Sequence, residues 1–341
     1  MISKNIQYNS KPERSRLFCP LNLSMSELFF SLVDYSNNYF TNNDPNKIIE
    51  FYNGFENRDQ LIQWMRERPK GVSNIHEVDG DKDIIVVITT ADFNGKYARE
   101  CRDNIFKGLH MIFVESGGRG DFYFNYAHNC NLGIRKAMEY SPKWLIVSND
   151  DMSKIDNVKI LMKELLTLPS SVSVAFAPNG EHIVADWQIG RTNLIGTLAQ
   201  YLIPRKGNLK YYADILRLRK KFEVKYMTLN SKFSFKEWHE FLYRRTNEKF
   251  KISGVFNLFR TDYLRQAENE TFDETFINGA EDTDLYLKVR RSSTITATID
   301  YKIANLRGRT LGNGRDRNLR EICNHAYLNY KISKRKLACK S

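Results

Sequence analysis

Residues 143–151 read KWLIVSNDD, an apolar run that ends directly in a polar and acidic cluster. The run from Leu145 to Ser148 is typical of a buried strand. Asn149, Asp150 and Asp151 then stand at its carboxyl end. Two adjacent carboxylates repel each other, and burying even one costs several kcal/mol unless something pairs with it. The two aspartates therefore either lie in solvent, with Asp150 as a helix cap, or hold a cation.

Two earlier segments repeat the pattern of an apolar run followed by polar residues. They are DIIVVITTADFNG (83–95) and LHMIFVESGG (109–118), and helical stretches at about 96–108 and 126–140 separate the three runs. A further strand is expected in 172–180. Strands that alternate with helices at this spacing predict an α/β fold with a parallel, doubly wound sheet.

The carboxyl ends of parallel strands lie at one edge of the sheet, where ligands bind in folds of this kind. The polar residues predicted at this edge are Thr89, Thr90, Asp92, Glu115, Asn149, Asp150 and Asp151. The glycine-rich stretch 115–122 lacks the spacing of dinucleotide-binding and P-loop motifs. Glu115 is therefore expected either to meet a ribose or base, or to belong to a plain turn.

A second acidic cluster occurs in FINGAEDTDLYLKVRR, residues 276–291. Leu285 and Val289 are four residues apart, which indicates one face of a helix. Glu281 and Asp282 then fall at its first turn, where the helix dipole favours the ionised carboxylate. An ionised, fixed carboxylate can act as a general base. Ordinary capping of the helix is the alternative.

The totals describe a folded protein with an excess of positive charge. The chain has 341 residues, 42% hydrophobic and 27% charged, which fits one large or two smaller domains. The five cysteines include no CxxC pair, so a reducing, cytoplasmic location is expected. No signal-like segment and no apolar run of about 20 residues occurs. The net charge of +12 favours anionic partners: nucleic acid, lipid headgroups or phosphate-bearing molecules.

The motifs, in this order, resemble those of the family 2 glycosyltransferases, which have the GT-A fold. The family commonly has a glycine and an apolar stretch ending in arginine, then Phe-Asp-Glu, then Glu-Asp-x-Asp-Leu and a later arginine. An Asn-x-Gly-Ile helix precedes its metal-binding acidic motif. The matching positions here are Asn131, Gly133, Ala137, Gly254, Phe259, Arg260, Phe272, Asp273, Glu274, Glu281, Asp282, Asp284, Leu285 and Arg290.

The resemblance implies a GT-A-type, Rossmann-like, mostly parallel sheet flanked by helices, and an inverting transfer of one sugar from a nucleotide-diphosphate sugar. It implies Mn²⁺ or Mg²⁺ bound by Asp151, with Asn149 or Asp150 on the metal, sugar or ribose. Asp282 would be the base, supported by Glu281. The implied donor-binding residues are Thr89, Thr90, Asp92, Glu115, Asn131 and Asp150.

The chain departs from the family pattern at two places. The acidic motif is Asn149-Asp150-Asp151 rather than Asp-x-Asp, and no histidine follows the base helix at the expected distance. Positively charged side chains are predicted to neutralise the phosphates instead. The residues expected near the phosphates or acceptor are Asp284, Arg307, Arg309 and Arg315. The QxxRW signature of processive members is absent, which favours transfer of a single sugar.

The expected layout has five parts. A mainly helical N-terminal extension (1–80) precedes a nucleotide-sugar-binding half (81–185). A basic helical insertion (186–251), an acceptor and base half (252–300) and a basic C-terminal tail (301–341) follow. Within 201–250, 13 Lys and Arg face 5 Asp and Glu, a net charge of +8.

The insertion is expected to recognise an acceptor (a glycan, protein or lipid) or to rest on the inner face of a membrane, with binding of nucleic acid disfavoured. Two alternatives stay open. One is a nucleotidyltransferase of similar fold, and the other is a non-catalytic basic protein that binds nucleic acid or serves as a scaffold.

Overall fold

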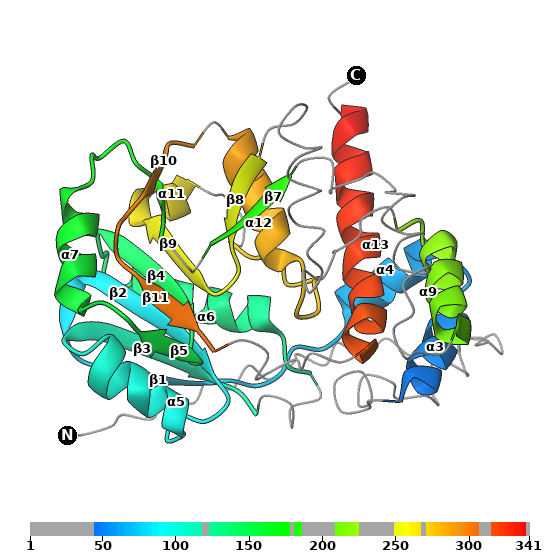
Figure 1. Cartoon of the computed structure of the whole chain (residues 1–341), viewed down its shortest axis with the longest axis horizontal. Helices are drawn as coiled ribbons and strands as arrows, with labels where there is room; N and C mark the ends of the chain where they lie inside the picture. Colours follow the sequence, from blue (N-terminus) through cyan, green and yellow to red (C-terminus); the bar gives the residue numbers. More distant parts are fainter. Residues whose placement is uncertain are drawn as a thin grey trace, which may run out of the picture.

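The centre of the molecule is a β-sheet with helices on both faces (Figure 1). The computed structural model describes residues 44–117, 123–177, 181–185, 209–224, 249–266, 271–292, 294–306 and 315–338. Within these residues the sheet has seven strands in the order β1-β3-β2-β4-β9-β6-β10. Their bounds are β1 Asn74–Val78, β2 Asp81–Thr90, β3 Leu109–Glu115, β4 Trp144–Asn149, β6 Val174–Phe176, β9 Phe256–Arg260 and β10 Thr296–Thr298.

The sheet is mostly parallel, as predicted. β2 is parallel to both β3 and β4, and β6 is parallel to β10. β9 is antiparallel to β4 and to β6, so β2, β3, β4, β6 and β10 all point the same way. β1 forms an antiparallel edge beside β3. The two reversed strands were not predicted, because an apolar run in the sequence does not reveal its direction.

The β-branched run of β2 fills both layers of the core. Ile84, Val86 and Ile88 pack on one face, and Ile85 and Val87 pack on the other. All five side chains are fully buried, as expected for a central strand with helices on both sides. The first face is covered by α5 (Lys96–Glu100), the π-helix η1 (Cys101–Ile105) and α7 (Val158–Thr167). The second is covered by α6 (Tyr126–Met138) and α12 (Glu281–Arg291).

Short polar side chains start several of the helices. Asp44 caps α3 (Pro45–Gly54), Asn57 caps α4 (Arg58–Glu67), Asn125 caps α6 and Asn157 caps α7. In each case the side-chain oxygen accepts a hydrogen bond from a backbone amide of the first turn. These bonds satisfy amides that have no partner inside the helix.

Gly133 lets α6 lie close against the sheet. A Cβ atom at this position would lie 2.2 Å from Cγ1 of Val87 on β2 and 3.0 Å from Cγ2 of Val114 on β3. No side chain fits such a gap, so glycine is required here for packing. The close approach fixes the position of α6 on this face of β2 and β3.

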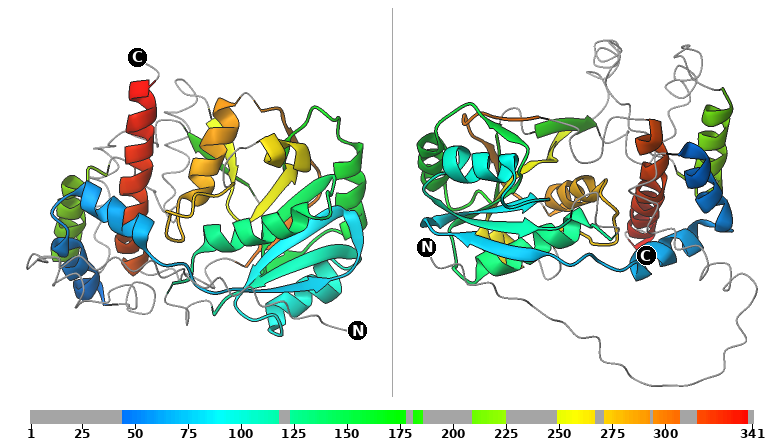
Figure 2. Two further views of the ribbon diagram at one scale, coloured as in Figure 1. Left: turned by 180° about the vertical axis from the view of Figure 1, so that it is seen from behind. Right: turned by 90° about the horizontal axis from the view of Figure 1, so that it is seen from below.

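Four helices form a second group at one end of the molecule (Figures 1 and 2). They are α3, α4, α9 (Leu209–Lys221) and α13 (Arg315–Ala338). The hydroxyl of Tyr52 on α3 donates to the carbonyl of Leu319 on α13 at 2.9 Å. The amine of Lys221 on α9 donates to the last carbonyls of α3, at 3.2 Å from those of Tyr52 and Asn53. The apolar residues of this group are continuous with one face of the sheet.

The C-terminal segment 301–341, predicted to be a basic tail, is instead a core element over much of its length. α13 buries an apolar face against the other helices, and β11 (Ile303–Asn305) pairs with β5 (Met152–Lys154). The buried apolar residues of α13 are Leu319, Ile322, Cys323, Ala326, Tyr327, Leu328 and Ile332. The sequence analysis missed this apolar face because it considered only the high proportion of Lys and Arg in the segment.

The N-terminal segment 1–80 holds α3 and α4 and also β1, which joins the sheet across the predicted boundary. Residues 1–43 lie outside the described part of the chain. Most of the predicted insertion also lies outside it, except α9 and the start of β8 (Lys249–Ser253). β8 pairs with β7 (Glu181–Ala185), and Ala185 is opposite Lys249. The residues that flank the segment 186–248 are therefore paired with each other.

Among the residues that the structure describes, no helix combines the length and the apolar character needed to cross a lipid bilayer.

Candidate functional site

The carboxyl ends of β2, β3 and β4 bring the predicted polar residues to one edge of the sheet. Thr90 is opposite Glu115 in the register of β2 and β3, and Thr89 is opposite Asn149 in the register of β2 and β4. Asp150 and Asp151 follow directly. The structure therefore places these six residues close together, as the parallel arrangement of the strands predicts.

Asp150 is held beside the end of β2. The hydroxyl of Thr90 donates to Oδ2 of Asp150 at 2.7 Å, and the thiol of Cys101 on η1 donates to the Asp150 carbonyl at 3.3 Å. Burial and the neighbouring charge of Asp151 raise the pKa of Asp150 to about 6, against the opposing hydrogen bond from Thr90. The site thus concentrates negative charge, which a cation would stabilise.

Asp151 is anchored from a distant part of the sequence. Its side chain is 5% exposed. Oδ1 accepts a hydrogen bond from Nδ2 of Asn305 at 2.9 Å, and its carbonyl accepts one from the amide of Leu306 at 2.9 Å. Both partners lie at the end of β11, which pairs with β5 just after the aspartate. The sequence analysis missed Asn305, because nothing in its local pattern indicates a partner so far away along the chain.

The residues at the end of β4 carry oxygen atoms of the type that a hard divalent cation takes. Asn149 contributes a buried Oδ1 that has no hydrogen-bond partner in the described part of the chain. With the carboxylates of Asp150 and Asp151 it makes a set of oxygen donors of the kind that Mg²⁺ and Mn²⁺ take. No group of three or more His, Cys, Asp or Glu residues suited to a metal occurs among the described residues. A cation bound by these residues would take its remaining ligands from water or a substrate phosphate.

Glu115, predicted to meet a ribose or base, contacts two neighbouring protein groups. Oε1 accepts a hydrogen bond from the amide of Phe93 at 2.8 Å, and Oε2 lies 2.8 Å from Nε2 of His76. Burial acts to raise the pKa of Glu115, but these two bonds lower it overall. The sequence analysis missed His76, because β1 was not predicted. Its ring stacks on Phe93 with centroids 4.3 Å apart.

The remaining residues predicted at this edge are nearby but differ in exposure. Thr89 is buried. Asp92 is exposed, and its backbone amide donates to the hydroxyl of Thr90 at 3.2 Å. Its Oδ1 accepts a hydrogen bond from the amide of Asn94 at 2.8 Å. Asp92 therefore stabilises the turn after β2 and still faces solvent.

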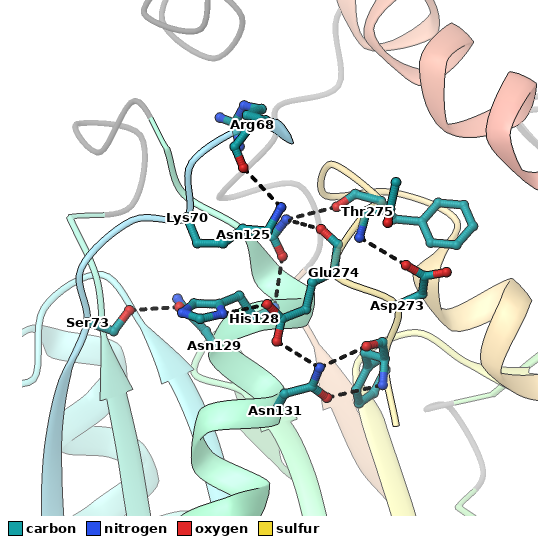
Figure 3. A network of polar contacts seen from close by, with 12 residues as sticks. Arg68, Lys70, Ser73, Asn125, His128, Asn129, Asn131, Asp273, Glu274 and Thr275 are labelled. Carbon is teal, nitrogen blue, oxygen red and sulfur yellow. Dashed lines mark hydrogen bonds and ion pairs between the residues drawn. The ribbon is translucent and has the colours of Figure 1, made fainter. Parts of the chain in front are cut away.

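Asn131 has a structural role that the sequence analysis did not foresee. Its Nδ2 donates to the carbonyl of Phe272 at 2.8 Å and to Oε1 of Glu274 at 3.1 Å, and its Oδ1 accepts from the amide of Phe272 at 3.1 Å. Figure 3 shows Asn131 facing this loop together with His128, whose Nδ1 lies 2.7 Å from Oε2 of Glu274. We therefore reassign Asn131 from donor binding to the packing of α6 against residues 272–274.

The predicted base helix begins where expected. α12 starts at Glu281, and Ala280 before it has a φ of 67°. Glu281 is buried and Asp282 is partly exposed. Oδ1 of Asp282 accepts a hydrogen bond from the amide of Thr283 at 2.6 Å. This bond holds the Asp282 carboxylate against the first turn of α12.

The segment before α12 is connected to the edge of the sheet that carries the polar residues. Oδ1 of Asn278 accepts a hydrogen bond from the amide of Tyr126, the first residue of α6, at 2.7 Å. Asn129, in the first turn of α6, donates to the hydroxyl of Ser116 just after β3 at 3.0 Å. The segment before α12 is thus tied through α6 to the carboxyl end of β3.

Asp284, predicted near the phosphates or acceptor, is instead part of an ion cluster. It is 1% exposed, and its Oδ2 lies 2.6 Å from Nζ of Lys331 on α13 and 3.4 Å from Nζ of Lys288. Lys331 also contacts Asp273. Because the Asp284 carboxylate is buried against two lysines of the protein itself, we assign it a structural role.

The three arginines predicted near the phosphates fall beyond what the structure describes. Arg307 and Arg309 lie outside the described residues, and Arg315 begins α13 with a side chain that is also outside them. The last described residue before this segment is Leu306, whose amide bonds to Asp151.

Comparison with models of known protein families gives no match to this chain. Comparison with curated protein sequences gives none either.

Proposed function

We propose that this chain is an inverting glycosyltransferase of the GT-A type, which moves one sugar from a nucleotide-diphosphate sugar to an acceptor hydroxyl. The observation that carries the proposal is the acidic pair at the carboxyl end of β4, of which Asp150 is partly buried and Asp151 buried, beside an Asn149 Oδ1 that has no partner among the described residues. Adjacent carboxylates repel each other, and a divalent cation bound by them would offset that repulsion. The family resemblance of the sequence supports the same function.

On the donor side, the residues at the end of β4 would bind Mn²⁺ or Mg²⁺. The cation would supply positive charge against the diphosphate leaving group. Asn305 fixes the direction of the Asp151 carboxylate through the 2.9 Å bond to Oδ1, so the ligand does not have to be ordered on binding. Asp92 and the edge around Glu115 would face the nucleoside.

On the acceptor side, Asp282 would act as the general base. Its carboxylate takes the proton of the acceptor hydroxyl while the hydroxyl oxygen forms a bond to the anomeric carbon. The bond from that carbon to the phosphate oxygen breaks, and its electron pair leaves with the nucleoside diphosphate. Attack from the face opposite the leaving group inverts the anomeric centre. Glu281, buried next to Asp282 in the chain, would support the base.

The acceptor would be recognised outside the sheet. We assign this role to the basic segment 186–250, which would contact a glycan, a protein or an anionic lipid surface. Its described part, α9, carries the exposed Arg217 and Lys220 on the outside of the helix group.

Calorimetric titration with nucleoside diphosphates tests the donor side of the proposal. We expect wild-type protein to bind one nucleoside diphosphate with Mn²⁺ and to lose that binding in EDTA. Asp151→Ala should weaken the binding at least about 100-fold, because it removes a metal ligand. Asp282→Asn should leave the affinity within about twofold, because the base does not contact the diphosphate.

Asp262→Ala is the matched control, since Asp262 is an exposed carboxylate on α11 (Thr261–Gln266) whose side chain contacts Arg265. It should bind as wild type does. An affinity for nucleoside diphosphate that is unchanged in Asp151→Ala and falls steeply with salt concentration would instead indicate a phosphate-binding basic surface. That result would overturn the proposal, and so would a wild-type protein that binds no nucleoside diphosphate.

A further inference from the structure

The segment that leads into α12 follows an unusual backbone path. Within residues 271–280, Asn278 has a φ of 53° and Ala280 a φ of 67°. Both are non-glycine residues in the left-handed region, which is sparsely populated and costs energy. Such a path persists only where the surrounding structure holds it. Asp282 follows Ala280 by two residues, so the path sets where this carboxylate points.

Three asparagine side chains from two other helices hold this segment. Asn131 on α6 bonds to both backbone groups of Phe272. Asn125, the cap of α6, donates to the carbonyls of Glu274 at 2.9 Å and Phe276 at 3.0 Å. Figure 3 shows both side chains turned toward the segment. The third asparagine comes from α13 and bonds to the segment at the position nearest to the base in the chain.

Asn324 on α13 forms two hydrogen bonds with the backbone of Ile277. Its Oδ1 accepts a hydrogen bond from the Ile277 amide at 2.8 Å, and its Nδ2 donates to the Ile277 carbonyl at 2.8 Å. Asn324 is 1% exposed. A Cβ atom on Gly279 would lie 2.9 Å from Nδ2 of Asn324. The glycine therefore provides the space that lets α13 approach the segment.

A second contact from the same helix reaches α12 itself. Lys331 lies about two helical turns after Asn324, so both side chains lie on one face of α13. Its Nζ lies 2.6 Å from Oδ2 of Asp284 in the first turn of α12 and also contacts Asp273. α13 thus fixes the segment before the base and the helical turn that carries it.

We propose that α13 positions the general base, and that Asn324 is the positioning residue through its two bonds to Ile277. This inference rests on the proposed function. Productive attack needs the base and the acceptor in a near-attack arrangement, and a displacement of about 1 Å can cost about 100-fold in rate. Asn324 acts on Asp282 through the backbone of residues 277–280 and contacts no substrate.

The test compares Asn324→Ala with Asn329→Ala. Asn329 is a matched control on the same helix: it is 4% exposed, and its Nδ2 donates to the carbonyl of His325 within α13 at 2.7 Å. Gly279→Ala is the second variant, because its new methyl group displaces the amide of Asn324 from the other side. Melting temperatures establish that each variant is folded before it is compared.

Two readouts decide the inference. In Asn324→Ala and Gly279→Ala, we expect hydrogen exchange in peptides covering 271–284 to accelerate at least about tenfold, with no such change in Asn329→Ala. We expect kcat for hydrolysis or transfer of the donor sugar to fall about 10- to 100-fold. The KM for the donor should stay within about twofold of the wild-type value, because the proposed donor-binding residues at the end of β4 are unchanged.

Exchange and kcat that match the Asn329→Ala control would overturn the positioning role. If Asn324→Ala does not fold, Gly279→Ala alone gives the decision by the same criteria. Failure of the proposed function gives a different result, which is a wild-type protein that turns over no donor. In that case the exchange data still show whether Asn324 holds residues 271–284.

Discussion

Individual lysine and asparagine side chains of α13 make the ion pairs and hydrogen bonds that hold α12 and the segment before it. Lys331 is placed between two carboxylates, Asp273 and Asp284, of which Asp284 is almost completely buried. The hydroxyl of Tyr327 adds a hydrogen bond to Oδ2 of Asp273 at 3.0 Å. Burial acts to raise the pKa of Asp273, but the charge and hydrogen bond of Lys331 outweigh it and lower the pKa to about 2. A carboxylate this acidic stabilises the folded protein while it is ionised.

The first prediction concerns the acid stability that Asp273 provides. Folding lowers the pKa of this carboxyl from its ordinary value of 3.8 to about 2. Its contribution to stability is therefore present well above the unfolded pKa and is lost as the pH falls toward the folded one. The shift corresponds to about 2 kcal/mol in the free energy of unfolding. Urea unfolding of wild type and Asp273→Asn measures it.

We expect the difference in free energy of unfolding between these two proteins to fall by about half between about pH 6 and about pH 3. A difference that stays constant over this range would show that Asp273 is not paired as described. Asp262→Asn provides the control, because this exposed carboxylate should give no such change.

The second prediction is that breaking the ion cluster destabilises the protein strongly. Lys331→Met removes the nearer of the two lysines that contact the buried Asp284, and loss of one partner of a buried pair costs on the order of 3 kcal/mol. Adding Asp284→Asn to Lys331→Met should recover part of that loss, because the buried carboxylate charge that lost its nearer lysine is then removed. Chemical unfolding of the two single variants and the double variant measures the coupling. Additive effects would contradict the pairing.

At the scale of elements, α13 connects parts of the molecule that are far apart in the sequence. It packs on α3 and α4, bonds to the segment before α12, and buries Leu328 and Ile332 in the same core as β2. Its sequence suggested a basic tail, because the prediction considered the many Lys and Arg residues and overlooked the apolar residues on one face of the helix. The strands were easier to predict, since a β-branched run such as that of β2 indicates burial on both sides by itself.

The third prediction distinguishes a core helix from a tail. Leu328→Ala should lower the free energy of unfolding by about 2–5 kcal/mol, because it removes a fully buried side chain and leaves a cavity. Leu166→Ala on α7 makes the same chemical change at a side chain that is 42% exposed, and it should cost much less. Equal effects, read from chemical unfolding, would mean that α13 does not pack as described.

The fourth prediction concerns the approach of α6 to the sheet. Gly133→Ala places a methyl group 2.2 Å from Cγ1 of Val87, so we expect a loss of about 1–3 kcal/mol from overpacking. Gly54→Ala at the end of α3 meets nothing within 4 Å and should be neutral or slightly stabilising. Thermal unfolding measures both, and a neutral Gly133→Ala would contradict the close contact.

At the scale of the whole molecule, the edge of the sheet and the helix group differ in how far the sequence predicts them. The acidic residues that follow β4 could be predicted from the sequence, because the strand pattern and the polar ends are both local. The residues that hold the candidate site in place could not be predicted from the sequence. Asn305 reaches Asp151, and Asn324 reaches Ile277, across long sequence separations. The helix group is assembled from the N-terminal segment, the insertion and the C-terminal segment, and no local pattern indicates that these three meet.

The measurement that tests the central claim most directly is release of nucleoside diphosphate from a panel of nucleotide sugars, with Mn²⁺, Mg²⁺ or EDTA. We expect the protein to hydrolyse its donor slowly with water, so the assay needs no acceptor. We expect release from one donor with a divalent cation, and a loss of at least about 100-fold in both Asp151→Ala and Asp282→Asn. Asp262→Ala should keep wild-type activity. Release that is unchanged in Asp151→Ala and Asp282→Asn, or no release from any donor, would contradict the account.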